Sequence, residues 1–221
     1  MWMTSAWLSM ILELNMFNTM SGISAKTFWL FLLFAILALS FVFRTSDPWL
    51  GMTVTMTPIT IAAMLSGTVR QHFKPSLFRL GTGLAAGFVL YGITKAVVKL
   101  FTVVWPGWEA SARALYSWRG THSVLFLGPT LVMIVLAEEL LWRGVVARFL
   151  MDRYGKAAGI VIAAAIYSLA HWATFNPLLL AAAFGCGLFW GSLYALTSDL
   201  SVPTVSHLLW DVLLLFLFPV V

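Results

Sequence analysis

Long apolar runs separated by short polar or basic turns are the dominant pattern along this chain. The runs cover residues 28–43, 52–69, 80–104, 123–149, 157–175, 178–197 and 202–218. A helix needs about 20 apolar residues to cross the hydrocarbon layer of a membrane, and most of these runs approach that length. The runs are continuous rather than alternating, which disfavours a closed β-barrel. We therefore expect an all-α, multi-pass transmembrane helical bundle with about seven spans.

The first 22 residues fit this pattern less well. Residues 1–22 are apolar but interrupted by polar residues and a glycine: Glu13, Asn15, Asn18 and Gly22. We expect an interfacial helix here, and the alternative is a first span, which would bring the total to eight. No repeat or interdomain linker is evident in the remaining sequence. Residues 23–221 are therefore expected to form a single transmembrane helical domain.

The composition supports a membrane protein. The chain is 61% hydrophobic and 10% charged, with a mean hydropathy of +0.95. An ordinary soluble domain is about 25% charged, so this chain has too few charges to cover a water-facing surface. The net charge of +5 comes mainly from residues between the runs, where they meet anionic lipid headgroups. The expected surroundings are thus the lipid bilayer, and no nucleic-acid partner is expected.

The basic residues also predict an orientation. If the N-terminus is cytosolic, seven basic residues fall on the inner side and three on the outer side: Lys26, Arg70, Lys74, Arg79, Arg148, Arg153 and Lys156, against Arg44, Arg113 and Arg119. Lys95 and Lys99, in the outer half of the third run, reduce this excess. Positive charge on the inner side is the usual bias. Together with the short loops, it favours a bacterial cytoplasmic membrane protein with its N-terminus inside.

Ionisable residues within the apolar runs indicate a buried site. Glu138, Glu139 and Asp211 lie well inside predicted spans, and so do His171 and His207. An ionised group in mid-bilayer costs about 2.5–3.5 kcal/mol even on the most lenient scale, so such groups persist where they pair, face water or do chemistry. Their concentration in the C-terminal half predicts a common site within residues 130–215.

Helical spacing predicts different surroundings for the two adjacent glutamates, Glu138 and Glu139. Glu139 and Arg143 are four residues apart, so they share a helix face and can form a structural ion pair. Glu138 is rotated by about 100° from Glu139 and points elsewhere. We therefore expect Arg143 to neutralise Glu139 and to leave Glu138 unpaired.

The same spacing of four recurs twice, in His207 and Asp211 and in Tyr167 and His171. A glutamate beside a histidine can activate water as a general base, and a second histidine can stabilise the resulting oxyanion. Two histidines and two carboxylates can instead hold a divalent metal such as zinc, which would then be bound by Glu138, His171, His207 and Asp211. No serine nucleophile motif is evident, so we favour activated water without a cofactor, and the zinc alternative stays open.

Three segments resemble motifs of a known family. EELLWRG at 138–144 resembles the EExxxR(G) motif of the type II CAAX prenyl-protease and bacteriocin-processing (CPBP) family. YSLAH at 167–171 resembles its FxxxH motif, with tyrosine in the aromatic position, and HLLWD at 207–211 resembles its Hxxx(N/D) motif. The motifs occur in the family's order on three separate predicted spans, and the N-terminal third carries no such resemblance.

The resemblance implies an intramembrane endopeptidase of the glutamate type, in which Glu138 and His171 activate the attacking water. It also implies that His207 and Asp211 position or stabilise the oxyanion. An ionised Asp211 would repel an oxyanion, where an asparagine would donate to it. We therefore expect Asp211 either to be protonated or to orient His207 by accepting its other N–H group, and we favour the second.

The predicted function is hydrolysis of a peptide bond in a membrane-associated protein or peptide. The sequence identifies neither the residues that bind the substrate nor the oligomeric state. One alternative is a non-enzymatic bacteriocin-immunity or partner-binding membrane protein of the same family. Another is a transporter or proton relay, since intramembrane carboxylates and histidines also suit that role. Counted along parallel helices, Glu138, His171 and His207 lie at different depths, so a common site requires staggered or tilted helices, or spans that end several residues away from the predicted positions.

Overall fold

A computed structural model describes residues 25–65, 72–120 and 122–221, and these residues contain helices and no strand. The expected interfacial helix at 1–22 lies outside the described residues. The α-helices are α2 (Ala25–Val42), α3 (Pro48–Leu65), α5 (Leu77–Val104), α6 (Trp108–Tyr116), α7 (Val124–Glu138), α8 (Arg148–Tyr154), α9 (Lys156–Ala170), α10 (Pro177–Thr197) and α11 (Ser201–Val212). Short 3₁₀ segments are η2 (Ser117–Arg119) and η4 (Trp172–Thr174), and π-helical segments are η3 (Glu139–Ala147) and η5 (Leu213–Leu217). The all-α prediction is confirmed for the described part.

Four helices of the described chain are long and apolar enough to cross a membrane. They are Leu77–Val104, Val124–Tyr154, Lys156–Thr174 and Pro177–Thr197. Two shorter apolar helices, Lys26–Val42 and Ser201–Leu217, correspond to the first and last runs. The structure thus fits an integral membrane protein, while seven crossings and the cytosolic N-terminus remain predictions.

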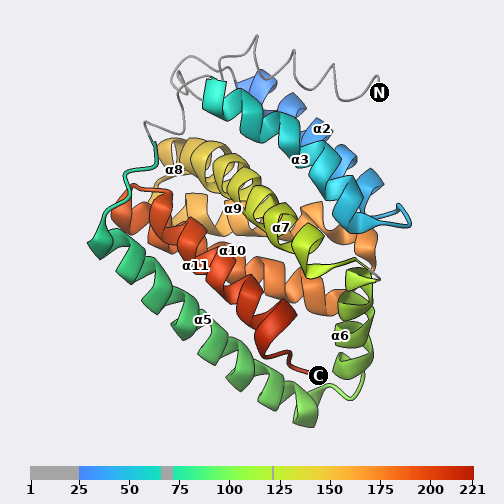
Figure 1. The fold of residues 1–221 in the computed structure, drawn as a ribbon. Coiled ribbons are helices and arrows are strands. Elements are labelled where there is room, and N and C mark those ends of the chain that lie inside the picture. The colour runs from blue at the N-terminus through green and yellow to red at the C-terminus, as the bar shows by residue number, and fades with distance from the viewer. Residues whose placement is uncertain (1–24, 66–71, 121) are drawn as a thin grey trace.

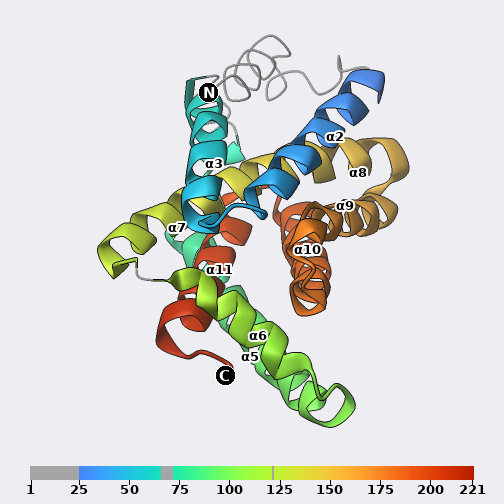
Figure 2. The same ribbon diagram turned by 90° about the vertical axis from the view of Figure 1, so that its right-hand side faces the viewer.

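A continuous helical rod formed by α7, η3 and α8 runs through the middle of the fold (Figure 1). The α2–α3 hairpin packs on one side of the rod, and α11 lies on the other side with α5 beyond it (Figures 1 and 2). Helices α9 and α10 form an antiparallel pair in contact with the π-helical part of the rod. The three predicted motifs therefore lie on elements that meet around the centre of this rod.

Small residues allow the closest helix contacts. A Cβ added at Gly187 of α10 would lie 3.0 Å from Ala164 Cα of α9, so a larger residue would push these helices apart. Gly87 of α5 stands in the same relation to α11, since its Cβ would lie 3.0 Å from the Ser206 carbonyl oxygen. Glycine at such crossings lets helix backbones approach closely. Gly187 therefore lets α9 and α10 pack closely, and Gly87 lets α5 pack against α11 next to Ser206, the residue before His207.

The turn between α9 and α10 fixes the position of His171, the residue that follows α9. Phe175 adopts a left-handed conformation with φ of 51°. Asn176 then caps α10, because its side-chain oxygen accepts the Leu179 N–H at 3.1 Å, and Pro177 occupies the first turn. This is the tight antiparallel turn that Asn176-Pro177 predicts.

The start of α11 is anchored by a buried carboxylate. Asp199 is fully buried and forms an ion pair with Arg79 at 2.9 Å. It also accepts the backbone N–H groups of Lys74 at 3.1 Å and Ser201 at 2.6 Å. The contacts with Lys74 and Arg79 tie the α10–α11 connection to the segment before α5 and to the first turn of α5. The helix that carries His207 thereby has a fixed starting point.

Candidate active site

Glu138 and Glu139 lie where the central rod changes from α-helix to π-helix. Glu138 is the last residue of α7, and Glu139 is the first residue of η3. Segments of π-helix are rare and often occur at functional sites. Both glutamates are buried, but only Glu138 lines the central cavity. As the helical rotation predicts, their side chains have different surroundings.

Glu139 contacts Arg143 inside the protein. Arg143 Nη1 lies 3.0 Å from Glu139 Oε1, and both side chains are buried. This contact is an ion pair without hydrogen-bond geometry, since neither Nη nitrogen of Arg143 forms a hydrogen bond with a described residue. The guanidinium instead packs against two rings, with Cζ 4.8 Å from the Tyr167 centroid and 5.1 Å from that of Trp190. Cation–π contacts and one ion pair therefore hold the arginine.

His207 is oriented by Glu139. Its Nδ1 lies 2.8 Å from Glu139 Oε1, and an ionised carboxylate can only accept, so Nδ1 carries the proton. Its Nε2 lies 3.5 Å from Asp211 Oδ2 and 3.9 Å from Glu138 Oε2. The sequence favoured Asp211 as the acceptor that orients this ring. In the structure, Glu139 of η3 accepts the hydrogen bond that orients the ring. Its contact with His207, at 2.8 Å, is shorter than the 3.5 Å contact between His207 and Asp211 within α11.

Tyr167 forms a hydrogen bond that the sequence analysis missed. Its hydroxyl donates to Glu138 Oε2 at 2.9 Å, so Glu138 is not without a partner. No described residue donates to the other carboxylate oxygen, Oε1. The signal in the sequence was the tyrosine itself, since a buried tyrosine hydroxyl requires a partner and a phenylalanine does not.

His171 lines the same cavity, next to Tyr167. Its Nδ1 is 2.8 Å from the Tyr167 carbonyl oxygen, which fixes Nδ1 as the donor and leaves a lone pair on Nε2. The ring packs edge-on against Tyr167, with centroids 4.9 Å apart, and lies 5.2 Å from the ring of Phe43. Among the described residues no direct hydrogen bond or ion pair joins His171 to Glu138, and Tyr167 connects the two.

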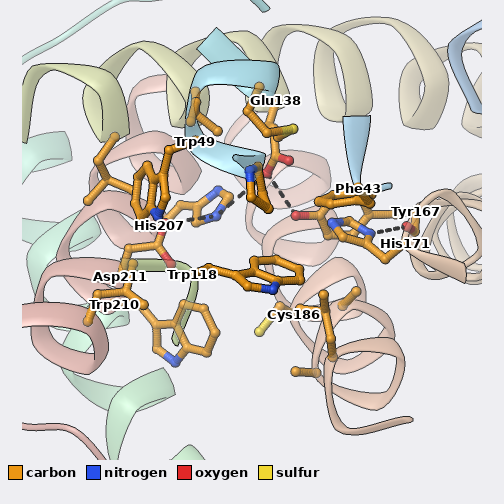
Figure 3. Close-up of a pocket in the computed structure, with 18 of the residues that line it drawn as sticks. Phe43, Trp49, Trp118, Glu138, Tyr167, His171, Cys186, His207, Trp210 and Asp211 are labelled. Carbon is orange, nitrogen blue, oxygen red and sulfur yellow. Dashed lines mark hydrogen bonds and ion pairs between the residues drawn. The ribbon is translucent and has the colours of Figure 1, made fainter. Parts of the chain in front are cut away.

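A cavity of about 180 Å³ brings the candidates together. Figure 3 shows Glu138, Tyr167 and His171 on one side of it and His207 with Asp211 on the other. Aromatic rings form much of the remaining wall: Phe43, Trp49, Trp118, Trp190 and Trp210. The helices are therefore staggered as a common site requires. The site combines two carboxylates, two histidines and an otherwise apolar surface.

Comparison with known proteins supports the resemblance. Residues 120–213 match the family model described as type II CAAX prenyl endopeptidase Rce1-like. The chain resembles this endopeptidase family. No curated protein and no solved structure gives a significant match. The matched segment extends from the approach to α7 through α11, and so contains every charged residue of the cavity.

The Rce1-like segment does not account for the whole cavity. Phe43 and Trp49 come from the α2–α3 hairpin, and Trp118 comes from η2, all outside the matched residues. Sequence reasoning missed these aromatic residues because they are far from the motifs and resemble ordinary lipid-facing residues. They line the cavity together with the charged residues.

The metal-binding alternative required four residues to converge: Glu138, His171, His207 and Asp211. In residues 25–65, 72–120 and 122–221, no group of three or more His, Cys, Asp or Glu side chains has the geometry of a metal site. Hydrogen bonds to protein groups already occupy the Nδ1 atoms of both histidines. Cys186, a buried residue of α10, also lines the cavity.

Proposed function

We propose that the protein is an intramembrane endopeptidase that hydrolyses a peptide bond of a membrane-associated protein or peptide. The observation that supports this most is the pairing of Glu138 and His171 on one cavity. Glu138 has one oxygen held by Tyr167 and the other without a donor, and His171 presents an unprotonated Nε2. A water molecule between these two acceptors would be polarised for attack on a carbonyl carbon.

In the proposed reaction, Glu138 takes a proton from water as the oxygen bonds to the scissile carbonyl carbon. His171 accepts the second hydrogen bond of that water and orients it. The carbonyl oxygen becomes an oxyanion in the tetrahedral intermediate. Glu138 then returns its proton to the amide nitrogen as the C–N bond breaks and the carbonyl re-forms, which leaves a carboxylic acid and an amine; the acid then passes its remaining proton to the amine.

His207 is proposed to stabilise the oxyanion. Its Nδ1–H is held by Glu139, so a second proton on Nε2 would point into the cavity between Asp211 and Glu138. A donor fixed in advance in a site from which water is largely excluded contributes strongly to acyl-transfer catalysis. Asp211 would hold the Nε2–H group in the empty enzyme and lose that contact when the oxyanion forms.

The test compares Glu138→Gln with wild type in the native host membrane and in proteoliposomes. Mass spectrometry of membrane-protein termini identifies chains cleaved by wild type, and chains that co-purify with Glu138→Gln provide substrates for reconstitution. Loss of a general base lowers the rate by about 10²- to 10⁴-fold, so no cleavage by the variant is expected. Glu109→Gln, on the exposed face of α6, is the matched control and retains activity.

Equal cleavage by wild type and Glu138→Gln would contradict the proposal. Host protection that depends on the protein but not on Glu138 would indicate a partner-binding membrane protein instead. Metal use is tested on the same proteoliposomes by exhaustive chelation, and the reaction proposed above predicts full activity afterwards. Activity lost on chelation and restored by zinc would support the four-residue metal alternative.

A further inference from the structure

The imidazole of His207 has one short hydrogen bond, from Nδ1 to Glu139 at 2.8 Å, and a longer contact of 3.5 Å from Nε2 to Asp211. The second torsion of a histidine side chain has a broad energy minimum, and one hydrogen bond tolerates considerable tilt. A tilt of about 30° around the held nitrogen moves Nε2 by about 1 Å, and a misplacement of that size is costly in catalysis. The site therefore needs a second element that fixes the plane of the ring.

Trp190 of α10 provides such an element. Its indole stacks on the His207 imidazole with centroids 3.7 Å apart and an interplanar angle of 24°. The indole is itself fixed, because only 1% of Trp190 is exposed and its Nε1–H donates to Ser206 Oγ at 3.3 Å. Ser206 directly precedes His207, so the tryptophan is attached to the same turn of α11 that carries the histidine.

The contacts of His207 and Trp190 form a closed loop of four side chains with Glu139 and Arg143 of the rod. Glu139 contacts both His207 and Arg143, and Trp190 also contacts both His207 and Arg143. Each of the four side chains thus has two neighbours in the loop. Because neither Nη nitrogen of Arg143 forms a hydrogen bond with a described residue, the indole is one of the groups that determine where its guanidinium lies. A disturbance at Trp190 would reach the imidazole directly and also through Arg143 and Glu139.

We propose that Trp190 is a positioning residue that holds the His207 imidazole in the plane from which Nε2–H reaches the oxyanion. This inference rests on the proposed endopeptidase reaction. A flat aromatic face suits the task better than an aliphatic chain, because it restricts tilting and also attracts a protonated imidazole through its π-electrons. Trp190 lies outside all three motifs, and its position in an apolar run gave no sign of this role.

The test uses two variants of the full chain in proteoliposomes. Trp190→Leu removes the aromatic ring, whereas Trp190→Phe keeps a smaller aromatic face for stacking and lacks the N–H group. With a fluorescent peptide spanning a bond cleaved by wild type, Trp190→Leu is expected to lower kcat about 10- to 100-fold with KM within about twofold. Trp190→Phe is expected to remain within about threefold of wild-type kcat.

A second readout does not require catalysis. With ¹⁵N-labelled histidine, the His207 Nδ1–H signal is expected to lose its protection from exchange in Trp190→Leu and to keep it in Trp190→Phe. Phe149→Leu is the matched control. The Phe149 ring stacks on that of Phe28 with centroids 3.8 Å apart, and Phe149 does not line the cavity. That variant loses a buried aromatic stack but leaves the His207 signal and kcat unchanged.

Two outcomes would overturn the inference. A raised KM with unchanged kcat in Trp190→Leu would show that the indole contacts substrate rather than positioning His207. Equal losses in Trp190→Leu and Phe149→Leu would show a general packing effect. Failure of the proposed reaction is recognised separately, because Glu138→Gln would then cleave like wild type whatever the histidine spectrum shows.

Discussion

Replacement of Tyr167 by phenylalanine tests how Glu138 is held. The change removes one oxygen atom and with it the 2.9 Å hydrogen bond to Glu138 Oε2. The ring keeps its packing against His171 and its cation–π contact with Arg143. Because both partners are buried, solvent has little access to replace the lost donor. The substitution therefore isolates the contribution of the hydroxyl.

The expected magnitude follows from the charge and burial of this pair. A hydrogen bond to a charged group contributes about 1.5–3 kcal/mol, and removing one partner leaves the buried carboxylate oxygen with its full desolvation cost. If the bond also fixes Glu138 in the transition state, the same energy corresponds to a fall in kcat of about 10- to 150-fold. We expect both a lower stability and a lower kcat for Tyr167→Phe, with KM nearly unchanged.

The assay measures kcat, KM and the thermal unfolding midpoint of the purified variant in proteoliposomes. Tyr91→Phe is the matched control, since the Tyr91 hydroxyl donates to the Phe218 carbonyl oxygen at an exposed position. That variant is expected to match wild type in kcat. Wild-type kcat in Tyr167→Phe would refute the reasoning that the hydroxyl positions the base, even if the unfolding midpoint falls.

Two further predictions concern stability. Arg143→Met leaves Glu139 without its buried counter-charge and should lower the free energy of unfolding by about 3–5 kcal/mol. Arg113→Met, the control at an exposed ion pair, should change the unfolding midpoint little. Similar midpoints for the two variants would contradict this prediction. Burial and the charge of Arg148 lower the pKa of His72 below its ordinary 6.5, and Arg148 donates to its neutral ring at 3.0 Å. The unfolded chain therefore binds more protons than the folded protein, so the stability of wild type should fall as the pH drops from about 7 to about 5. The stability of His72→Gln should fall less steeply over the same range. Identical slopes of stability against pH in the two proteins would contradict this prediction.

Local spacing explains which parts of the site were predictable. Residues four apart on a helix share a face whatever the rest of the fold does, so the contact between Glu139 and Arg143 follows from the sequence. The same rule separates Glu138 from Glu139. Helical periodicity states which residues lie together on one face. It does not state which other helix that face meets.

The contacts that were missed all join different elements. Glu139 reaches His207 on α11, 68 residues away, and Tyr167 of α9 reaches Glu138, 29 residues away. The spacing of four correctly placed Asp211 beside His207, but a closer acceptor from the rod takes the orienting hydrogen bond. Trp190 could not be distinguished from other large apolar residues, because its role depends on the ring it faces.

The apparent difference in depth among the candidate residues arose from treating the spans as parallel rods of equal length. The rod Val124–Tyr154 contains 31 residues and would be roughly 45 Å long as a regular α-helix, against a hydrocarbon layer of about 30 Å. It must therefore tilt or project beyond that layer. Its π-helical part shifts the register further, so residue counts from one end do not give the depth of Glu138.

The two adjacent glutamates where α7 meets the π-helical segment have different surroundings. Glu139 is fully buried and lies between two positively polarised groups, Arg143 and the Nδ1–H of His207. Glu139 does not line the cavity, so a water molecule bound there does not contact it. Glu138 faces the cavity with one oxygen held by Tyr167 and one oxygen directed to no described donor. Identical residue types one position apart therefore act as a structural anchor and as the proposed base because of what each one faces.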